Sequence, residues 1–409
     1  MAAVPVLSRI RQALEAARAA GDVRHEAILI GNLGACYEGL GLYRRAQRTL
    51  GQADVAARRI GEHLLLFNNR LNLLSVELAL RRLATSRSLL EDLTDTVATT
   101  PDLASHGPLL ELQRGRMELL GGRARAAARA FERGAEQDRQ RSVRIASLAE
   151  LGGARLADGQ VREALASTQR AVDELRSLGT TSSFDIVDPS AVWWHHAQAL
   201  KANGRAAAAA RALHSGYRIL ARSIGGLGDA GLRRNAMNKR AERRAVVIAW
   251  MTHARSAGLP RPQWTAHLPH AADLGDSVGR LVEAGLRLNE LRSVDVLVDL
   301  LLDEATELSG AQRVLVVLED RSGRRIGGSL VPYAETDTDV LRAITPWLDE
   351  ARGTRASRLR HGPEGADAVD QRSCLVAPLV AQDELLGYLY CDMDGAFGRF
   401  GDSDRELLG

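Results

Sequence analysis

The chain is poor in several kinds of residue, and each shortage excludes a class of protein. It has three cysteines, Cys36, Cys374 and Cys391, in 409 residues, too few and too widely spaced for a disulfide framework or a zinc cluster. Aromatic residues make up only 4% of the chain, whereas alanine, leucine and arginine, which favour helices, are abundant. Lys201 and Lys239 are the only lysines, which we interpret as the coding bias of a GC-rich genome. A mainly helical chain in a reducing compartment is expected.

Long apolar runs are also missing. The N-terminus lacks the apolar core of a signal peptide, and no stretch is apolar enough to span a bilayer. The net charge of +3 is small for this length, so it gives no support for a nucleic-acid or membrane partner. We therefore expect a cytoplasmic protein of two or three domains with neither of those partners.

The strongest pattern that is present is a 40-residue repeat near the N-terminus. Five residues (Gly21, Asn32, Leu33, Leu40, Leu50) recur as Gly61, Asn72, Leu73, Leu80 and Leu90. A period of about 34 to 45 residues with helical patterning is typical of a stacked array of helix pairs. Such arrays usually work as binding surfaces.

Small residues alternate with large ones inside each copy, which allows two helices to approach closely. The residues expected to pack the pairs are Leu33, Gly34, Tyr37, Ala46, Gly115, Ala127, Leu151, Gly152 and Ala164. This order resembles the tetratricopeptide repeat (TPR), and five units fit into residues 8–222 at a spacing nearer 40 than 34. The second copy departs from it at Leu74, Glu77 and Ser86. The resemblance implies an all-α superhelical solenoid over residues 1–222 that binds a protein partner.

Residues 223–258 are expected to form a helical capping region. Gly226–Gly231 matches the dinucleotide fingerprint G-x-G-x-x-G, but a helical pattern precedes it and the fingerprint requires a strand. We interpret it as the end of a helix followed by a loop. The basic run Arg233–Arg244 has no interleaved aromatic residues for base stacking, so a solvated helix face with an acidic protein partner is favoured over a nucleic-acid surface.

A proline-containing linker is predicted at 259–275, and a connecting helix at 276–308. The apolar spacing of that helix fits two structures, a two-stranded coiled coil in its first half or a single amphipathic helix that packs on a sheet.

After residue 310 the pattern changes to strands. Arg313–Leu318 is an apolar strand, a helix with apolar residues from Val340 to Leu348 follows, and Ser373–Leu379 and Leu385–Asp392 form an antiparallel hairpin. These segments resemble a GAF domain, a small-molecule and dimerisation module, over about 291–409. The resemblance implies an α/β (α+β) domain with a central antiparallel sheet and a last helix leading into an output domain. Asp402 or Ser403 is a plausible N-cap of that helix, and the domain looks incomplete at Gly409.

Family pockets lie between the sheet and a covering loop, here about 327–370. Cys374, Tyr388 and Tyr390 are the ligand-pocket candidates, although apolar alternation also explains them as core. His195 and His196 are helix neighbours that point about 100° apart, so they are interpreted as packing residues. No metal site and no cofactor is evident.

The sequence holds no phosphate-binding loop, zinc-protease motif or nucleophile elbow. We therefore expect a non-catalytic regulatory region of a bacterial signalling protein. In it, repeats bind a protein and the GAF domain senses a small molecule or forms a homodimer. Two alternatives remain: a fragment of a larger kinase or nucleotide cyclase, and a TPR-containing transcriptional regulator.

Overall fold

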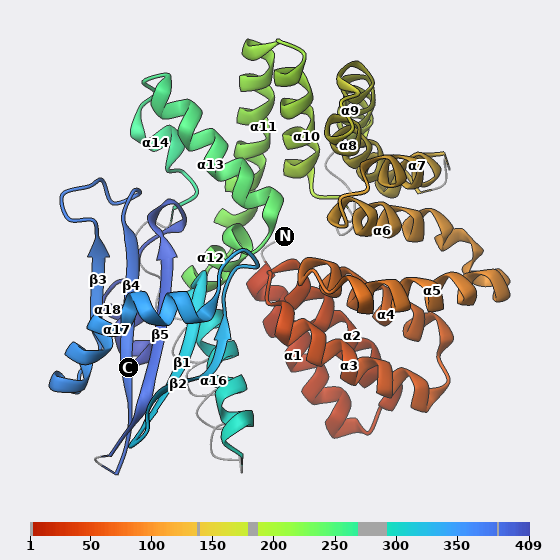
Figure 1. Ribbon diagram of the computed structural model, residues 1–409. Coiled ribbons are helices and arrows are strands. Elements are labelled where there is room, and N and C mark those ends of the chain that lie inside the picture. Colours follow the sequence, from red (N-terminus) through yellow and green to blue (C-terminus); the bar gives the residue numbers. More distant parts are fainter. Residues whose placement is uncertain (1–2, 137–139, 179–186, 269–292, 383) are drawn as a thin grey trace.

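The computed structural model describes residues 3–136, 140–178, 187–268, 293–382 and 384–409. A curved row of helices leads to a small α/β domain, so the predicted fold class is confirmed. Figure 1 shows the row, in red to green, curving round so that its first and last helices both lie beside the blue α/β domain. We call residues 3–268 the helical array.

The array begins with α1 (Ala3–Ala20) and continues as antiparallel helix pairs. The pairs are α2 (Val23–Gly39) with α3 (Tyr43–Ile60), α4 (His63–Ala79) with α5 (Leu83–Thr99), α6 (Gly107–Leu120) with α7 (Ala124–Ala135), α8 (Arg141–Ala157) with α9 (Val161–Ser177), and α10 (Pro189–Ala202) with α11 (Ala206–Gly225). A 3₁₀ turn, η1 (Pro101–His106), separates α5 from α6. The predicted repeats thus correspond to five helix pairs.

The same close contact recurs within the pairs. A Cβ added to Gly34 would lie 2.7 Å from the Leu50 side chain, and one on Gly115 would lie 2.3 Å from the Phe131 ring. Gly152 faces Thr168 in the same way, at 2.2 Å. In each case the glycine precedes its neighbour by sixteen positions, so the helix pairs share one packing register. Leu33, Tyr37, Ala46, Ala127, Leu151 and Ala164 are all buried around these contacts.

The turn inside each pair also repeats. In three pairs a glycine with positive φ lies seven positions after the packing glycine, at Gly41, Gly122 and Gly159. Gly204 has positive φ in the turn between α10 and α11. In the second pair Arg81 takes this place with φ +57°, an uncommon conformation for a residue with a Cβ. The three residues of this pair that depart from the repeat pattern also fit the packing. Leu74 and Ser86 are buried, and Glu77 accepts a hydrogen bond from Gln47.

The capping region consists of two helices, α12 (Ala230–Asn238) and α13 (Ala241–Ser256), which follow a loop after α11. The fingerprint-like glycines therefore follow a helix and not a strand. The expected linker is partly folded: α14 (Arg261–Trp264) places Trp264 and His267 in the interior. Residues 269–292, which include the predicted coiled-coil segment, lie outside the described residues.

The C-terminal domain is a five-stranded antiparallel sheet with the order β2-β1-β5-β4-β3. Its strands are β1 (Arg313–Asp320), β2 (Gly323–Leu330), β3 (Arg358–Gly362), β4 (Arg372–Ala381) and β5 (Glu384–Asp394). The β4–β5 hairpin forms as predicted, and a bulge follows Leu379. Pro378 lies beyond the five residues of β4 that pair with β3, so no ladder hydrogen bond to β3 is lost there.

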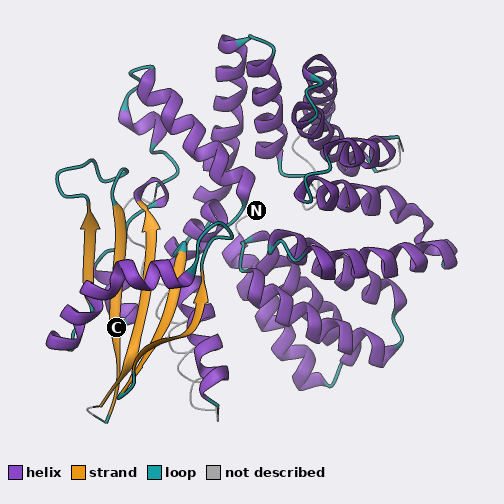
Figure 2. Ribbon diagram, viewed as in Figure 1, coloured by secondary structure: helices purple, strands orange, loops and turns teal. Residues whose placement is uncertain are grey.

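Helices cover both faces of the sheet (Figure 2). On one face, α16 (Val294–Ser309) and α18 (Asp402–Leu408) pack against Val314, Val316 and Leu389. On the other, α17 (Asp337–Thr354) packs against Leu315 and Val317. Consecutive residues of β1 thus point to opposite faces, as the pleat requires. The described part of the predicted connecting helix, α16, packs on the sheet, and the segment predicted as a possible coiled coil lies outside the described residues.

Two predictions about this domain are wrong. Residues 327–370 are not a covering loop, since they contain the end of β2, all of α17 and β3. The polar sequences of β2 and β3 concealed them, because both are edge strands that need not be apolar. The N-cap of α18 is Gly401 and not Asp402 or Ser403, and the Asp404 carboxylate accepts the Gly401 N–H at 2.8 Å.

Candidate functional site

The three pocket candidates lie on the sheet face that α17 covers, where they are part of a filled core. The Tyr390 hydroxyl donates to Asp392 Oδ2 at 2.5 Å and lies 3.6 Å from Cys374 Sγ. Tyr388 is separate from this pair, since its hydroxyl donates to Glu319 Oε2 at 2.5 Å. Val340, Ile344 and Leu348 of α17 fill the space above the strands. The structure therefore brings two of the three candidates together, but in packed core.

Burial also controls the chemistry of these groups. It raises the pKa of the Cys374 thiol to about 11 and, with the Asp392 carboxylate nearby, raises the pKa of Tyr390. Both groups stay protonated near neutral pH, so Cys374 is not a nucleophilic thiolate. Among the described residues, no cluster of three or more histidine, cysteine or carboxylate side chains is placed to hold a metal ion.

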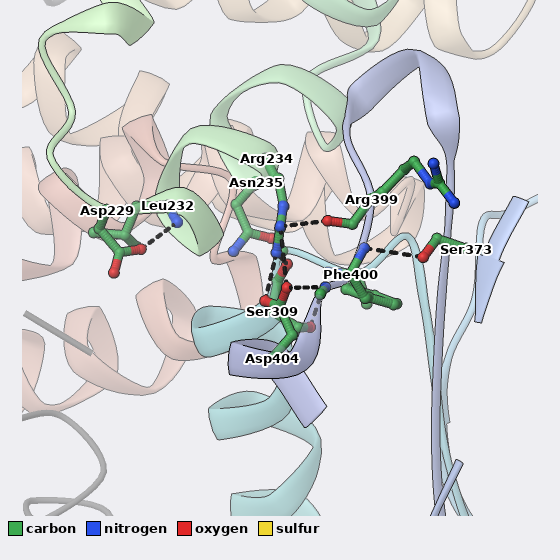
Figure 3. Close-up of polar contacts among 12 residues, drawn as sticks. Asp229, Leu232, Arg234, Asn235, Ser309, Ser373, Arg399, Phe400 and Asp404 are labelled. Carbon is green, nitrogen blue, oxygen red and sulfur yellow. Dashed lines mark hydrogen bonds and ion pairs between the residues drawn. The ribbon is translucent and has the colours of Figure 1, made fainter. Parts of the chain in front are cut away.

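A second group of polar side chains lies between the array and the C-terminal domain (Figure 3). The Arg234 guanidinium, on α12, donates to both oxygens of the Asp404 carboxylate at 2.6 and 3.2 Å. It also donates to the carbonyl oxygens of Ser309, at 3.0 Å, and Arg399, at 2.7 Å. One buried side chain of the array thus binds the end of α16 and the start of α18.

The rest of α12 continues this contact. Asn235 Nδ2 donates to the Thr306 carbonyl at 2.7 Å, and Asn238 Nδ2 donates to the Gly310 carbonyl at 2.8 Å. Both carbonyls lie at the C-terminal end of α16, where the Thr306 carbonyl also accepts the Gly310 N–H at 2.9 Å. A Cβ on Gly231 would lie 2.1 Å from the Leu308 carbonyl oxygen, so only glycine permits this approach. We call these contacts the α12 interface.

The sequence prediction for this segment is wrong. Arg233–Arg244 is not one solvated helix face, because Arg234, Asn235 and Asn238 are buried and the helix breaks at Lys239 and Arg240. Burial lowers the pKa of Lys239 to about 8, against the opposing effect of Asp392. Charge alone could not reveal this, although one glycine and two asparagines within the nine residues of α12 are a poor match to an exposed helix.

A separate contact joins α3 to α16 through charged side chains. Arg44 pairs with Asp299, Arg45 with Glu307 and Arg48 with Asp303. The Asp303 and Glu307 side chains are only 4% and 2% exposed, whereas that of Arg48 is 46% exposed. Burial, with the like charges of Arg44 and Arg45, lowers the pKa of Arg48. We call this cluster the α3 interface.

A third feature is a groove of about 1290 Å³ on the inner side of the curved array. Trp193, Arg176, Arg222 and Gln113 line it, together with Lys239–Arg243, which join α12 to α13 and form the first turn of α13. Two buried polar atoms, Gln113 Oε1 and His195 Nδ1, have no hydrogen-bond partner among the described residues. His196 instead packs inside, with Nδ1 3.1 Å from Thr168 Oγ1.

Fold and contacts together describe a helical repeat array docked on a small α/β domain. Residues 293–409 match the family model of the GAF domain, so the C-terminal domain is a GAF domain. A search of curated proteins found no match to the chain. Among the described residues, no helix is both long enough and apolar enough to cross a bilayer.

Proposed function

We propose that this chain is a non-catalytic, cytoplasmic regulatory region of a bacterial signal-transduction protein. Its helical array acts as a set of TPR-like repeats that bind a protein partner in the groove, and its GAF domain responds to that binding. The recurrent glycine contacts and positive-φ turns of the helix pairs support the TPR-like interpretation.

One observation carries the proposal: a single short segment contributes to both the groove and the GAF interface. Lys239, Arg240 and Arg243 line the groove, while Arg234 and Asn235, one to two turns earlier, bind the GAF domain. A partner that shifts α12 or α13 therefore changes contacts to α16 and α18. This differential contact is what any ligand needs in order to shift a conformational equilibrium.

The groove favours a protein segment with acidic and apolar side chains. Apolar residues such as Leu71, Leu109 and Leu220 form much of its wall, and seven cationic side chains on the wall exceed the four carboxylates. Arg222 is exposed and has no ion-pair partner among the described residues. Charge complementarity would guide such a segment into the groove and select its orientation.

Site-specific photo-crosslinking in the source cells tests the partner. A photoreactive amino acid at Arg222, inside the groove, should give a discrete adduct with one protein. The same amino acid at Val55, which is 68% exposed on α3 and outside the groove, is the matched control. Adducts that are identical at both positions, or absent at Arg222, would contradict the proposal.

The response of the GAF domain is tested with the crosslinked protein. Hydrogen exchange in α16 and α18 should change when the groove is occupied, since their ends bind α12. Unchanged exchange there would leave a binding array without a relay to the GAF domain. An ATPase assay on the chain should show no turnover, and measurable turnover would refute the non-catalytic assignment.

A further inference from the structure

A second hollow, of about 400 Å³, lies where α13 meets the end of the GAF sheet. The array contributes Arg244 and Ile248, and the GAF domain contributes Arg313, Arg372 and Phe397. None of its lining residues belongs to α17, so it is separate from the packed face that holds Cys374 and Tyr390. Its volume lies in the range of about 300–1000 Å³ that is usual for small-molecule sites.

Two of its guanidinium groups are held in place by one buried carboxylate. Asp392 is fully buried, and its oxygens lie 2.8 Å from Arg313 Nε and 2.6 Å from an Arg372 terminal nitrogen. Glu335 binds Arg313 from the other side at 2.9 Å. Since a guanidinium carries five N–H donors in a rigid plane, these pairs orient Arg313 and Arg372 and still leave donors for a ligand.

The third guanidinium comes from the other domain. Arg244 is exposed and forms no ion pair among the described residues, so its charge is available to an occupant of the hollow. Ile248 is 41% exposed and, with Pro332 and Phe397, supplies an apolar wall.

Two carboxylates also line the hollow, and both are engaged: Glu335 by Arg313, and Asp394 by the Ala396 N–H at 2.9 Å. The site therefore combines orientated cationic donors, among them Arg244, which is unpaired within the described part of the chain, with an apolar surface.

We propose that this hollow binds a small organic oxyanion, with a carboxylate or phosphate head and an apolar body. The head would bind Arg244 together with Arg372 or Arg313, because guanidinium groups pair with both kinds of oxyanion in bidentate geometry. The body would lie against Ile248 and Phe397. Such a ligand contacts both domains, so it binds only the docked arrangement and stabilises it.

This site also adjoins the partner groove, because Ala241 at the start of α13 lines both. A bound oxyanion would hold α13 against the GAF sheet and so restrict the segment that the groove partner contacts. The assignment itself does not depend on the proposed partner, since it rests on the hollow and its charges alone.

Calorimetric titration of the full chain with three probes of one shape tests the ligand class. Benzoate and phenyl phosphate carry the two oxyanion heads, and benzamide is the neutral counterpart. We expect saturable binding of at least one anion up to about 10 mM, a range in which a site with a Kd of about 1 mM fills, and no binding of benzamide. The tighter of the two anions identifies the head.

Two variants locate the binding. Arg244→Gln should weaken the anion at least about tenfold, as expected for the loss of one charge-assisted contact, and it leaves every observed ion pair intact. Arg59→Gln, at an exposed arginine of α3 that forms no ion pair with any other described residue, should bind as the unchanged protein does. Hydrogen exchange should show protection by the ligand in both 241–248 and 372–394.

Three results would overturn the assignment: no binding of either anion, equal binding of benzamide, or unchanged affinity in Arg244→Gln. Protection confined to one domain would refute the bridging arrangement. These measurements need no partner protein. Their outcome therefore tests the oxyanion site independently of the crosslinking experiment, which tests the partner groove.

Discussion

The α12 and α3 interfaces hold the same GAF helix, α16, by different means. At the α12 interface, buried Arg234, Asn235 and Asn238 donate mainly to main-chain carbonyls. At the α3 interface, Arg44, Arg45 and Arg48 pair with carboxylate side chains. Main-chain carbonyls do not titrate, and salt screens buried hydrogen bonds to them only weakly. Ion pairs between partly exposed side chains, in contrast, weaken as the salt concentration rises. The first interface therefore fixes the geometry, and the second makes docking sensitive to conditions.

The largest expected effect follows from Arg234→Met. The substitution removes the guanidinium that binds the Asp404 carboxylate and two main-chain carbonyl groups, which we expect to lower the free energy of unfolding by about 3–5 kcal/mol. Urea unfolding measures it. Arg218→Met, at an exposed position of α11, is the control and should stay within about 0.5 kcal/mol. Combining Arg234→Met with Asp404→Leu should recover part of the lost stability, because no unpaired carboxylate remains. If Arg234→Met alone lowers the free energy of unfolding no more than Arg218→Met does, the α12 interface contributes little.

Gly231→Ala tests the close backbone approach at the same interface. The added Cβ would lie 2.1 Å from the Leu308 carbonyl oxygen, so α12 and α16 must separate, at a cost of about 2–4 kcal/mol. Gly228→Ala is matched to it, because a Cβ there meets nothing within 4 Å. Thermal unfolding of the pair should show a loss for Gly231→Ala only. Equal melting temperatures would mean that the helices adjust freely.

A third, neutral contact predicts a pH dependence. His267 is buried, its Nε2 lies 2.8 Å from the Ala396 carbonyl oxygen, and its Nδ1 lies 2.8 Å from the Tyr217 hydroxyl. Nε2 must therefore donate, because a carbonyl oxygen only accepts, and in the neutral ring Nδ1 accepts from the Tyr217 hydroxyl. Burial lowers the pKa of His267 to about 4, although the bond to Ala396 opposes the shift.

The unfolded chain, with an ordinary histidine pKa of about 6.5, takes up a proton at higher pH than the folded protein does. The stabilisation from neutral His267 is thus complete above pH 6.5 and is lost as pH falls toward 4, by about 1.4 kcal/mol per unit. Urea unfolding at pH 7 and pH 5 measures the loss. His267→Gln should show a smaller difference between the two pH values, and an unchanged difference would assign the effect to other histidines.

Substitutions at the α3 interface should have the smallest effects. Arg45, 11% exposed, pairs with nearly buried Glu307, so Arg45→Gln should cost about 1–2 kcal/mol. Arg48→Gln, at the more exposed partner of Asp303, should cost less than about 1 kcal/mol. Urea unfolding in low and high salt distinguishes the interfaces: salt should remove most of the Arg48→Gln effect and little of the Arg234→Met effect. A salt response that is equal for both would remove the distinction.

Local patterns in the sequence predicted much of the fold for physical reasons. In the array, each helix packs on its neighbour in the chain, so Gly34, Gly115 and Gly152 could be recognised beside the residues they contact. The β4–β5 hairpin is equally local. The edge strands β2 and β3 were missed because their polar residues carry no alternation, and the core residues Cys374, Tyr388 and Tyr390 could not be distinguished from pocket residues by pattern alone.

The sequence by itself determined the helix pairs and the apolar faces of the strands, since each depends on residues close together in the chain. Only the tertiary structure decided the fate of the polar residues. Arg234 meets Asp404 across 170 positions, and Arg45 meets Glu307 across 262, so no local pattern shows that these charges face each other. Whether a charged side chain is solvated or buried is set by the surface that folding brings against it.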